Sequence, residues 1–186
     1  MRAIIIPTGQ EILDGIVLDT DSPTVMSCLI GMTPNCEIYK IAPLPDDIHG
    51  IRDAVENWVA QNANLIVLIG GSGGGHRHSR TLSPDCTWVA ILDVVDRKAC
   101  REIRGKNGHL WCKLICGKKG ETMIINLPGP FVEAKACIEA FCQVYPAAEG
   151  DLGKINQAMT EALLALYPVS SVRDTGCEKE TGNKKL

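Results

Sequence analysis

The chain has 186 residues, the size of one ordinary domain. Apolar residues make up 45 % of it and aromatic residues only 4 %, so the sequence predicts an aliphatic core. The net charge of −3 argues against nucleic acid as a partner, because nucleic-acid binding requires a basic face. The sequence has no run of 18 apolar residues and no secretory leader, so we expect a cytoplasmic protein without a membrane partner.

The first third of the chain alternates short apolar runs with helical patterns. The expected elements are a strand at 3–6, a loop with a short strand at 16–18, a helix from Asp21 to about Gly31, a strand at 37–42 and a helix capped by Asp47. The loop Pro7-Thr8-Gly9 directly follows the first strand. A polar, glycine-containing loop therefore leaves the first strand of the predicted sheet.

The central stretch, residues 64–85, reads NLIVLIGGSGGGHRHSRTLSPD. Its apolar run at 65–69 is typical of a strand buried on both faces, and five glycines follow within residues 70–75. Ser83-Pro84-Asp85 then predicts the start of a helix that runs to about residue 95, with a stripe of Val89, Leu92 and Val95. Backbone N–H groups and a helix N-terminus facing a glycine loop favour an anion site. The alternative is a flexible loop that only turns the chain.

The second half of the chain contains a charged segment and then a further alternation of strands and helices. We expect a charged surface or loop at 96–108, a strand at 110–116, a turn at 117–120, a strand at 122–127, and helices at 130–145 and 150–167. Residues 169–186 are expected to form a mobile tail. Residues 1–168 are therefore predicted to form one α/β domain, a three-layer sandwich around a mostly parallel sheet.

In such sheets ligands bind beyond the carboxyl ends of the strands. Three loops are expected at that edge, namely Thr8-Gly9, residues 70–75 and residues 127–130, and Pro45-Asp46-Asp47 can join them. Their convergence is the strongest argument from the residues themselves that the chain has a binding site there.

Several segments together resemble the molybdopterin-binding domain of molybdenum-cofactor biosynthesis proteins. The matching pieces are residues 6–13 with 19–22, Pro45-Asp46-Asp47, residues 70–73, residues 80–85, Leu110-Trp111-Cys112-Lys113, Gly117 and residues 125–129 (INLPG). The resemblance covers about residues 2–145. The family that the chain resembles includes adenylyltransferase, molybdenum-insertion and competence-damage-inducible types.

The resemblance implies a homotrimer that binds molybdopterin, a pterin with a dithiolene and a phosphate. Adenylyltransferase members join AMP from ATP to that phosphate with Mg²⁺. The resemblance implies that Thr8, Gly9, Gly70, Gly71, Ser72, Gly73, Cys112, Lys113, Asn126, Pro128 and Gly129 bind the ligand, that Asp46 and Arg80 are catalytic, and that Asp46 binds the metal.

The chain departs from the family at positions that matter for catalysis. The family has an Asp after the Arg of its glycine segment; here Thr81 or His78 stands there, depending on the alignment. Cys112 replaces a usual Ser, and Lys113 a usual Arg. We therefore expect binding to be kept more surely than adenylyl transfer. A nucleotide pyrophosphatase of the competence type and a non-catalytic oligomeric partner remain alternatives.

The same residues have simpler interpretations. Asp46 can be simply the cap of the following helix, with no role in a site. His76 and His78 can be polar residues of a solvated loop. Cys112 has no base next to it in the sequence, so a buried thiol is expected rather than a nucleophile. Most of the nine cysteines are expected to be reduced thiols that serve as small apolar residues of the core.

Overall fold

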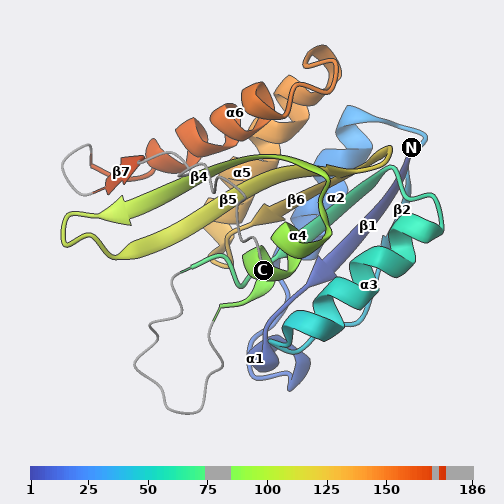
Figure 1. Ribbon diagram of the computed structural model, residues 1–186, viewed down its shortest axis with the longest axis horizontal. Coiled ribbons are helices and arrows are strands. Elements are labelled where there is room, and N and C mark those ends of the chain that lie inside the picture. Colours follow the sequence, from blue (N-terminus) through green and yellow to red (C-terminus); the bar gives the residue numbers. More distant parts are fainter. Residues whose placement is uncertain (74–84, 169–171, 175–186) are drawn as a thin grey trace, which may run out of the picture.

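The computed structural model has a seven-stranded sheet with helices on both faces (Figure 1). It describes residues 1–73, 85–168 and 172–174. The strands are β1 (Arg2–Pro7), β2 (Glu37–Lys40), β3 (Leu65–Ile69), β4 (Arg97–Gly105), β5 (Leu110–Lys119), β6 (Thr122–Leu127) and β7 (Val172–Asp174). The helices are α1 (Gln10–Leu13), α2 (Asp21–Met32), α3 (Ile48–Ala60), α4 (Thr87–Val94), α5 (Phe131–Val144), α6 (Leu152–Leu164) and the short 3-10 helix Tyr145–Ala147.

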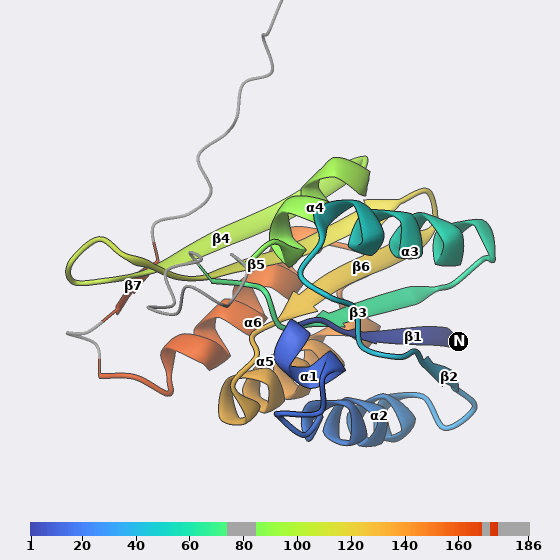
Figure 2. The same ribbon diagram turned by 90° about the horizontal axis from the view of Figure 1, so that it is seen from below.

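The three-layer α/β architecture is confirmed. Helices α3 and α4 cover one face of the sheet, and α2, α5 and α6 cover the other (Figure 2). The strand order is β2-β1-β3-β6-β5-β4-β7. Strands β2, β1, β3 and β6 pair in parallel, whereas β5, β4 and β7 add antiparallel pairings. The sheet is thus mixed, and the expectation of a mostly parallel sheet holds only for its first four strands.

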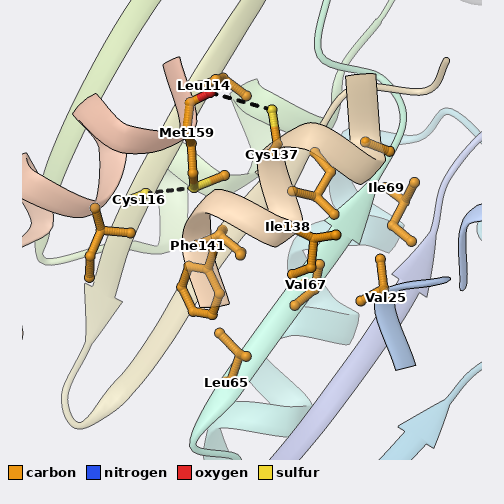
Figure 3. Close-up of a cluster of buried hydrophobic side chains, with 14 of the residues drawn as sticks. Val25, Leu65, Val67, Ile69, Leu114, Cys116, Cys137, Ile138, Phe141 and Met159 are labelled. Carbon is orange, nitrogen blue, oxygen red and sulfur yellow. Dashed lines mark hydrogen bonds between the residues drawn. The ribbon is translucent and has the colours of Figure 1, made fainter. Parts of the chain in front are cut away.

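Each face of the sheet carries its own core. On the α5 side, Val67 and Ile69 of β3 point toward Ile138 and Phe141 of α5, as Figure 3 shows. On the other side, Ile66 and Leu68 pack with residues of α3 and α4. All five residues of β3 are buried, because successive side chains of a central strand enter opposite cores. The continuous apolar run in the sequence is explained by this double burial.

Sulfur atoms help to join α6 to the sheet. The Cys116 thiol of β5 lies 3.6 Å from the Met159 sulfur of α6, and the Cys137 thiol of α5 lies 3.6 Å from the Met159 carbonyl oxygen (Figure 3). Cys116 and Cys137 are free and buried, as expected for thiols used as small apolar residues. In the described part of the chain, five further cysteines are free thiols.

The charged segment at 96–108 was expected to be a charged surface or a loop, and the loop prediction is wrong, although Arg97 and Lys98 are exposed. Residues Arg97–Gly105 form β4, which pairs with β5 and β7. The strand tolerates its charges because it lies near the edge of the sheet, and Arg104 and Glu102 pair at 2.6 Å on one side of it. The turn predicted at 117–120 is also shorter, because β5 continues to Lys119.

Two other local predictions are wrong. Residues 16–18 form no strand; the N–H groups of Ile16 and Val17 return to the Glu11 carbonyl, and the Ile16 side chain is 78 % exposed. The stripe predicted for α4 is also wrong as the fully buried face: Ala90, Ile91 and Val94 are buried, whereas Leu92 and Val95 of the stripe are only partly buried against the same core.

Several expectations fall on residues outside those that the structure describes. They concern Arg80, His76, His78, Thr81 and most of the expected tail. The helix expected to start at Ser83-Pro84-Asp85 begins later, at Thr87, because Asp85 and Cys86 are not helical. Three residues of that tail, Val172–Asp174, form β7. Among the described residues, no helix has both the length and the apolar character to cross a bilayer.

Candidate functional site

The carboxyl ends of three parallel strands lie level at one edge of the sheet. Pro7 of β1 pairs with Ile69 of β3, and Ile69 pairs with Leu127 of β6. The backbone continues these contacts into the loops, since the Thr8 N–H donates to Ile69 at 2.8 Å and the Gly70 N–H donates to Leu127 at 3.1 Å. The three loops predicted to converge are therefore neighbours in space.

The segment around Asp46 joins the same edge. The Gly9 N–H donates to the Leu44 carbonyl at 3.0 Å, which fixes the chain before Asp46 beside the first loop. The Asp46 carboxylate accepts from the Gln10 N–H at 3.3 Å, at the start of α1. The predicted cap of α3 is Asp47, whose carboxylate accepts from the Gly50 N–H at 2.8 Å. Asp47 therefore does the capping, and Asp46 faces the crevice.

Glycine is required at the turn that leaves β3. Gly70 and Gly71 have φ angles of 99° and 59°, in the left-handed region that side chains disfavour. A Cβ atom on Gly71 would lie 2.2 Å from the Thr87 hydroxyl oxygen, and one on Gly70 would lie 2.6 Å from the Thr8 carbonyl oxygen. The Thr8 and Thr87 hydroxyl groups share a buried hydrogen bond of 2.8 Å. The loop thus passes between the first loop and the N-terminus of α4.

Beyond the last backbone pair between β5 and β6, side chains hold the two strands. The Asn126 amide accepts from the Ile115 N–H at 2.7 Å and donates to the Lys113 carbonyl at 2.8 Å. The glycine loop enters at this position, where the Lys113 N–H donates to the Ser72 carbonyl at 2.7 Å. The Trp88 indole N–H also holds the loop, by donating to the Gly73 carbonyl at 3.1 Å. The sheet is split here, and the glycine loop fills the split.

Two cavities open on the two sides of this loop, and we name them by their lining. The acidic cavity, of about 250 Å³, is lined by Thr8, Gly9, Glu11, Ile12, Val17, Asp21, Asp46, Ile69, Gly70, Gly71, Asp85, Gly129 and Pro130. The aromatic cavity, of about 300 Å³, is lined by Gly71, Ser72, Gly73, Asp85, Ile103, His109, Leu110, Trp111, Cys112, Pro128, Gly129, Pro130, Glu133, Leu163 and Tyr167. Gly71, Asp85, Gly129 and Pro130 belong to both, so the cavities are adjacent.

The acidic cavity has a strong excess of negative charge. Four carboxylate side chains line it, and no Lys or Arg does so among the described residues. Asp21 is only 7 % exposed, and its Oδ1 atom has no hydrogen-bond partner. Burial, together with repulsion from Asp19, raises the pKa of Asp21 to about 6. The four carboxylates would repel an anionic ligand that enters this cavity.

Asp21 was missed as a site residue by sequence reasoning. Its position suggested only the first turn of a helix, which it does occupy in α2. No group of three or more His, Cys, Asp or Glu side chains within residues 1–73, 85–168 and 172–174 is arranged to hold a metal ion.

The structure brings most of the expected ligand-binding residues to the two cavities. The acidic cavity receives Thr8, Gly9, Asp46, Gly70, Gly71 and Gly129, and the aromatic cavity receives Gly71, Ser72, Gly73, Cys112, Pro128 and Gly129. Lys113 and Asn126 line neither cavity. Arg80, the expected catalytic cation, lies outside the described residues.

Lys113 and Asn126 are placed differently from the expectation for ligand contacts. The Lys113 ammonium lies 3.3 Å from a Glu102 carboxylate oxygen and 4.3 Å from the centre of the Trp88 ring, and its side chain is 13 % exposed. Asn126 is fully buried and bonded to β5. In this structure both side chains stabilise the walls of the site rather than its interior.

Cys112 lies in the wall of the aromatic cavity as a buried thiol. Its Sγ atom lies 3.5 Å from the Ser72 hydroxyl oxygen, to which it donates. Burial raises the pKa of the Cys112 thiol to about 12, and the Ser72 contact offsets this only in part. A thiol with this pKa is protonated at neutral pH and is a poor nucleophile.

Sequence reasoning also missed the far wall of the aromatic cavity. Glu133 stands in the first turn of α5, and the Tyr167 hydroxyl, beyond the end of α6, donates a short hydrogen bond to its carboxylate. The rings of Trp111 and Tyr167 meet edge to face at 5.3 Å. These residues are 22 to 56 positions apart in the sequence, and no local pattern connects them.

Comparison with known proteins agrees with this geometry. Residues 4–148 match the family model "Probable molybdopterin binding domain". The chain is 27 % identical over 157 residues to a molybdenum cofactor biosynthesis bifunctional protein of Chlorobaculum tepidum, covering 81 % of this chain and 49 % of that protein. It is 29 % identical over 98 residues to a CinA-like protein of Amoebophilus asiaticus, covering 52 % and 21 % respectively. The chain thus spans half or less of the curated relatives it matches.

Solved structures share the fold at low sequence identity. The molybdopterin biosynthesis enzyme MoaB from Thermus thermophilus superposes with a TM-score of 0.60 and 22 % identity, covering 84 % of this chain and 96 % of that one. MogA gives a TM-score of 0.62 with 18 % identity, covering 82 % and 99 %. The protein CinA from Thermoplasma acidophilum gives 0.57 with 18 % identity and the same coverage.

Proposed function

We propose that this chain, which belongs to the molybdopterin-binding domain family, binds molybdopterin or its adenylylated form across the two adjacent cavities. The observation that carries the proposal is the split of the sheet between β5 and β6. The glycine loop and the Leu127–Gly129 backbone meet there, and both cavities share Gly71 and Gly129 at the carboxyl edge.

The phosphate end of the ligand is proposed to bind at the glycine loop. Within the described residues, the N–H groups of Gly71, Ser72 and Gly73 donate no hydrogen bond to the protein, so they remain for an acceptor. The acidic lining argues that the phosphate binds together with a divalent cation. Asp46 and Asp21 are the residues that would hold Mg²⁺, which when bound would offset the phosphate charge.

Adenylyl transfer from ATP is a more specific proposal than the binding of molybdopterin. The carboxylates of the acidic cavity favour it, because they can hold a cation for the charge neutralisation that the reaction needs at a triphosphate. The family's glycine-loop Asp is replaced here by Thr81 or His78. Asp21 supplies a carboxylate to the same cavity and is proposed to act in place of the missing one. A homotrimer and a cytoplasmic location complete the proposal.

The first experiment is calorimetric titration of the protein with molybdopterin, with and without Mg²⁺. We expect micromolar or tighter binding that Mg²⁺ strengthens about tenfold or more, and Asp46→Asn should lose most of that Mg²⁺ effect. Asp53→Asn is the matched control, because Asp53 lies on α3 with a 65 % exposed side chain and lines neither cavity. Absence of molybdopterin binding by the unaltered protein would refute the proposal.

A nucleotide pyrophosphatase is the second candidate, favoured by the similarity to CinA-like proteins in sequence and fold. The two activities differ in their products. Release of pyrophosphate from ATP only when molybdopterin is present supports adenylyl transfer, whereas release of AMP from a dinucleotide without any pterin supports the pyrophosphatase. Tight pterin binding with neither product supports a non-catalytic binding partner.

A further inference from the structure

The aromatic cavity has a wall that the matched family region does not supply. The family match ends at residue 148, whereas Leu163 and Tyr167 come from α6 and the residues after it. Leu163 is buried beneath the cavity, and Tyr167 is only partly exposed. The C-terminal helix of this chain therefore adds surface to the site.

The polar group beside this added surface is the Glu133 carboxylate, which comes from α5 within the matched region. The Tyr167 hydroxyl donates to its Oε1 atom, which fixes the carboxylate in one orientation. In the described residues, Oε2 has no hydrogen-bond partner. Burial raises the pKa of Glu133, because the carboxylate is desolvated without a nearby cation. The Glu133 carboxylate thus has the capacity to accept hydrogen bonds from a ligand.

The remaining lining suits a flat ring. Trp111 is 40 % exposed, and its ring meets Tyr167 edge to face, so the exposed part of the indole can take a stacked partner. Pro128 and Gly129 also line the cavity and offer a thin backbone wall. The volume of about 300 Å³ is enough for a two-ring heterocycle and too small for a complete dinucleotide.

We infer that the aromatic cavity is a subsite for a planar heterocycle with an amidine-type N–H edge, held by Glu133 and stacked on Trp111. A carboxylate pairs with two adjacent N–H donors in a bidentate manner. The 2-amino-4-oxo edge of a pterin or of guanine offers such a pair, whereas adenine offers a donor beside an acceptor. The subsite therefore selects the pterin end of the ligand. This inference rests on the proposed function, because the neighbouring acidic cavity would then take the phosphate end.

The test separates ring recognition from phosphate recognition. Molybdopterin, neopterin (a pterin without phosphate), adenosine and Mg²⁺-pyrophosphate are titrated against the unaltered protein and Glu133→Gln. We expect Glu133→Gln to weaken neopterin and molybdopterin binding about tenfold or more and to leave Mg²⁺-pyrophosphate binding unchanged. Adenosine should bind the unaltered protein at least tenfold more weakly than neopterin. Tyr167→Phe, which removes only the orienting hydroxyl, should weaken neopterin binding about threefold.

Glu139→Gln is the matched control on the same helix. Its side chain is 50 % exposed, contacts Lys135 and lines neither cavity, so ligand affinity should not change. Thermal unfolding of each variant verifies that the fold is intact. Molybdopterin binding that is unaffected by Glu133→Gln overturns the inference and leaves the proposed function standing.

The converse result is also informative. Neopterin or guanosine binding that depends on Glu133, in a protein that does not bind molybdopterin, would refute the proposed function and keep the ring subsite. If the unaltered protein binds none of the ring compounds, the subsite is refuted together with the pterin-binding function.

Discussion

The two halves of the sheet contribute to one crevice by different means. Strands β1, β3 and β6 end level in a parallel arrangement, and their loops supply backbone groups and carboxylates to the acidic cavity. Strand β5 runs antiparallel to β6 and supplies the side chains of Trp111 and Cys112 to the aromatic cavity. The parallel half thus combines main-chain groups with carboxylates, and the antiparallel half contributes uncharged side chains.

This difference predicts different sensitivity to mutation. Backbone conformation at the parallel edge depends on glycine and on the strand register, so substitutions there should affect stability and binding together. Side chains of the antiparallel half line the aromatic cavity, so substitutions there should change ligand affinity more than stability. The following changes test this contrast, from the largest expected effect on stability to the smallest.

Gly71→Ala should have the largest effect. The Cβ atom would overlap the Thr87 hydroxyl at 2.2 Å in a residue with φ of 59°. We expect a loss of about 2–5 kcal/mol in the free energy of unfolding, from left-handed strain and overpacking together. Gly120→Ala is the matched control, because Gly120 has φ of 55° with open space around it and should lose only about 1 kcal/mol. Equal losses in urea unfolding would show that the close approach to Thr87 is unimportant.

Asn126→Ala tests the junction between the two halves. It removes both hydrogen bonds that hold Ile115 and Lys113 beyond the β5–β6 ladder, and it leaves a buried N–H and a buried carbonyl unpaired. We expect a loss of about 2–4 kcal/mol. Asn57→Ala, at an exposed position of α3, should change stability by less than about 0.5 kcal/mol. A loss below about 1 kcal/mol for Asn126→Ala would mean that the glycine loop alone holds the split.

Asp21→Asn should stabilise the protein at neutral pH in the absence of divalent cations. The pKa of Asp21 rises from 3.8 to about 6 on folding, mainly through burial. Between about pH 4 and 6 the folded state binds more protons than the unfolded state, so stability falls as pH rises through that window and stays lower above it. Removing the charge should recover on the order of 1–2 kcal/mol at pH 7 and nothing near pH 3.5.

The measurement for Asp21→Asn is urea unfolding from pH 3.5 to 8 with EDTA present. Asp53→Asn serves as the control, because the Asp53 side chain is 65 % exposed. If the free energy of unfolding of Asp21→Asn differs from that of the unaltered protein by the same amount at every pH, Asp21 does not titrate in this window. Addition of Mg²⁺ should narrow the difference at pH 7 if Asp21 helps to hold the cation.

Lys113→Met should have the smallest effect of the four. The change removes the contacts with Glu102 and with the Trp88 ring, while Arg104 keeps its own pairing with Glu102. We expect a loss of about 1 kcal/mol and a higher pKa for Glu102, detectable by NMR titration. Lys135→Met, whose partner Glu139 is exposed, should lose no more than about 0.5 kcal/mol. A large loss of molybdopterin affinity in Lys113→Met would instead restore Lys113 as a ligand contact.

The sequence alone was sufficient for the parallel half of the fold. Strands at 3–6, 65–69 and 122–127 were predicted because a strand buried on both faces must be apolar at every position. Their loops were predicted to meet because parallel strands place their carboxyl ends at one edge. The glycines of the central loop predicted a backbone with positive φ that approaches a neighbour closely, and Gly70 and Gly71 have this conformation.

Only the tertiary structure determined how the antiparallel strands pair and where their side chains point. Strand β4 is charged, and its hydrogen-bonding partners β5 and β7 made it a strand where local sequence favoured a surface. The Lys113 side chain turned toward Glu102 and Trp88, and Asn126 was used to bridge two strands. Glu133, Trp111 and Tyr167 formed one wall only after α5, β5 and α6 had packed. Local sequence determines which backbone conformations are favourable, whereas the direction and partner of a side chain depend on elements distant in the chain.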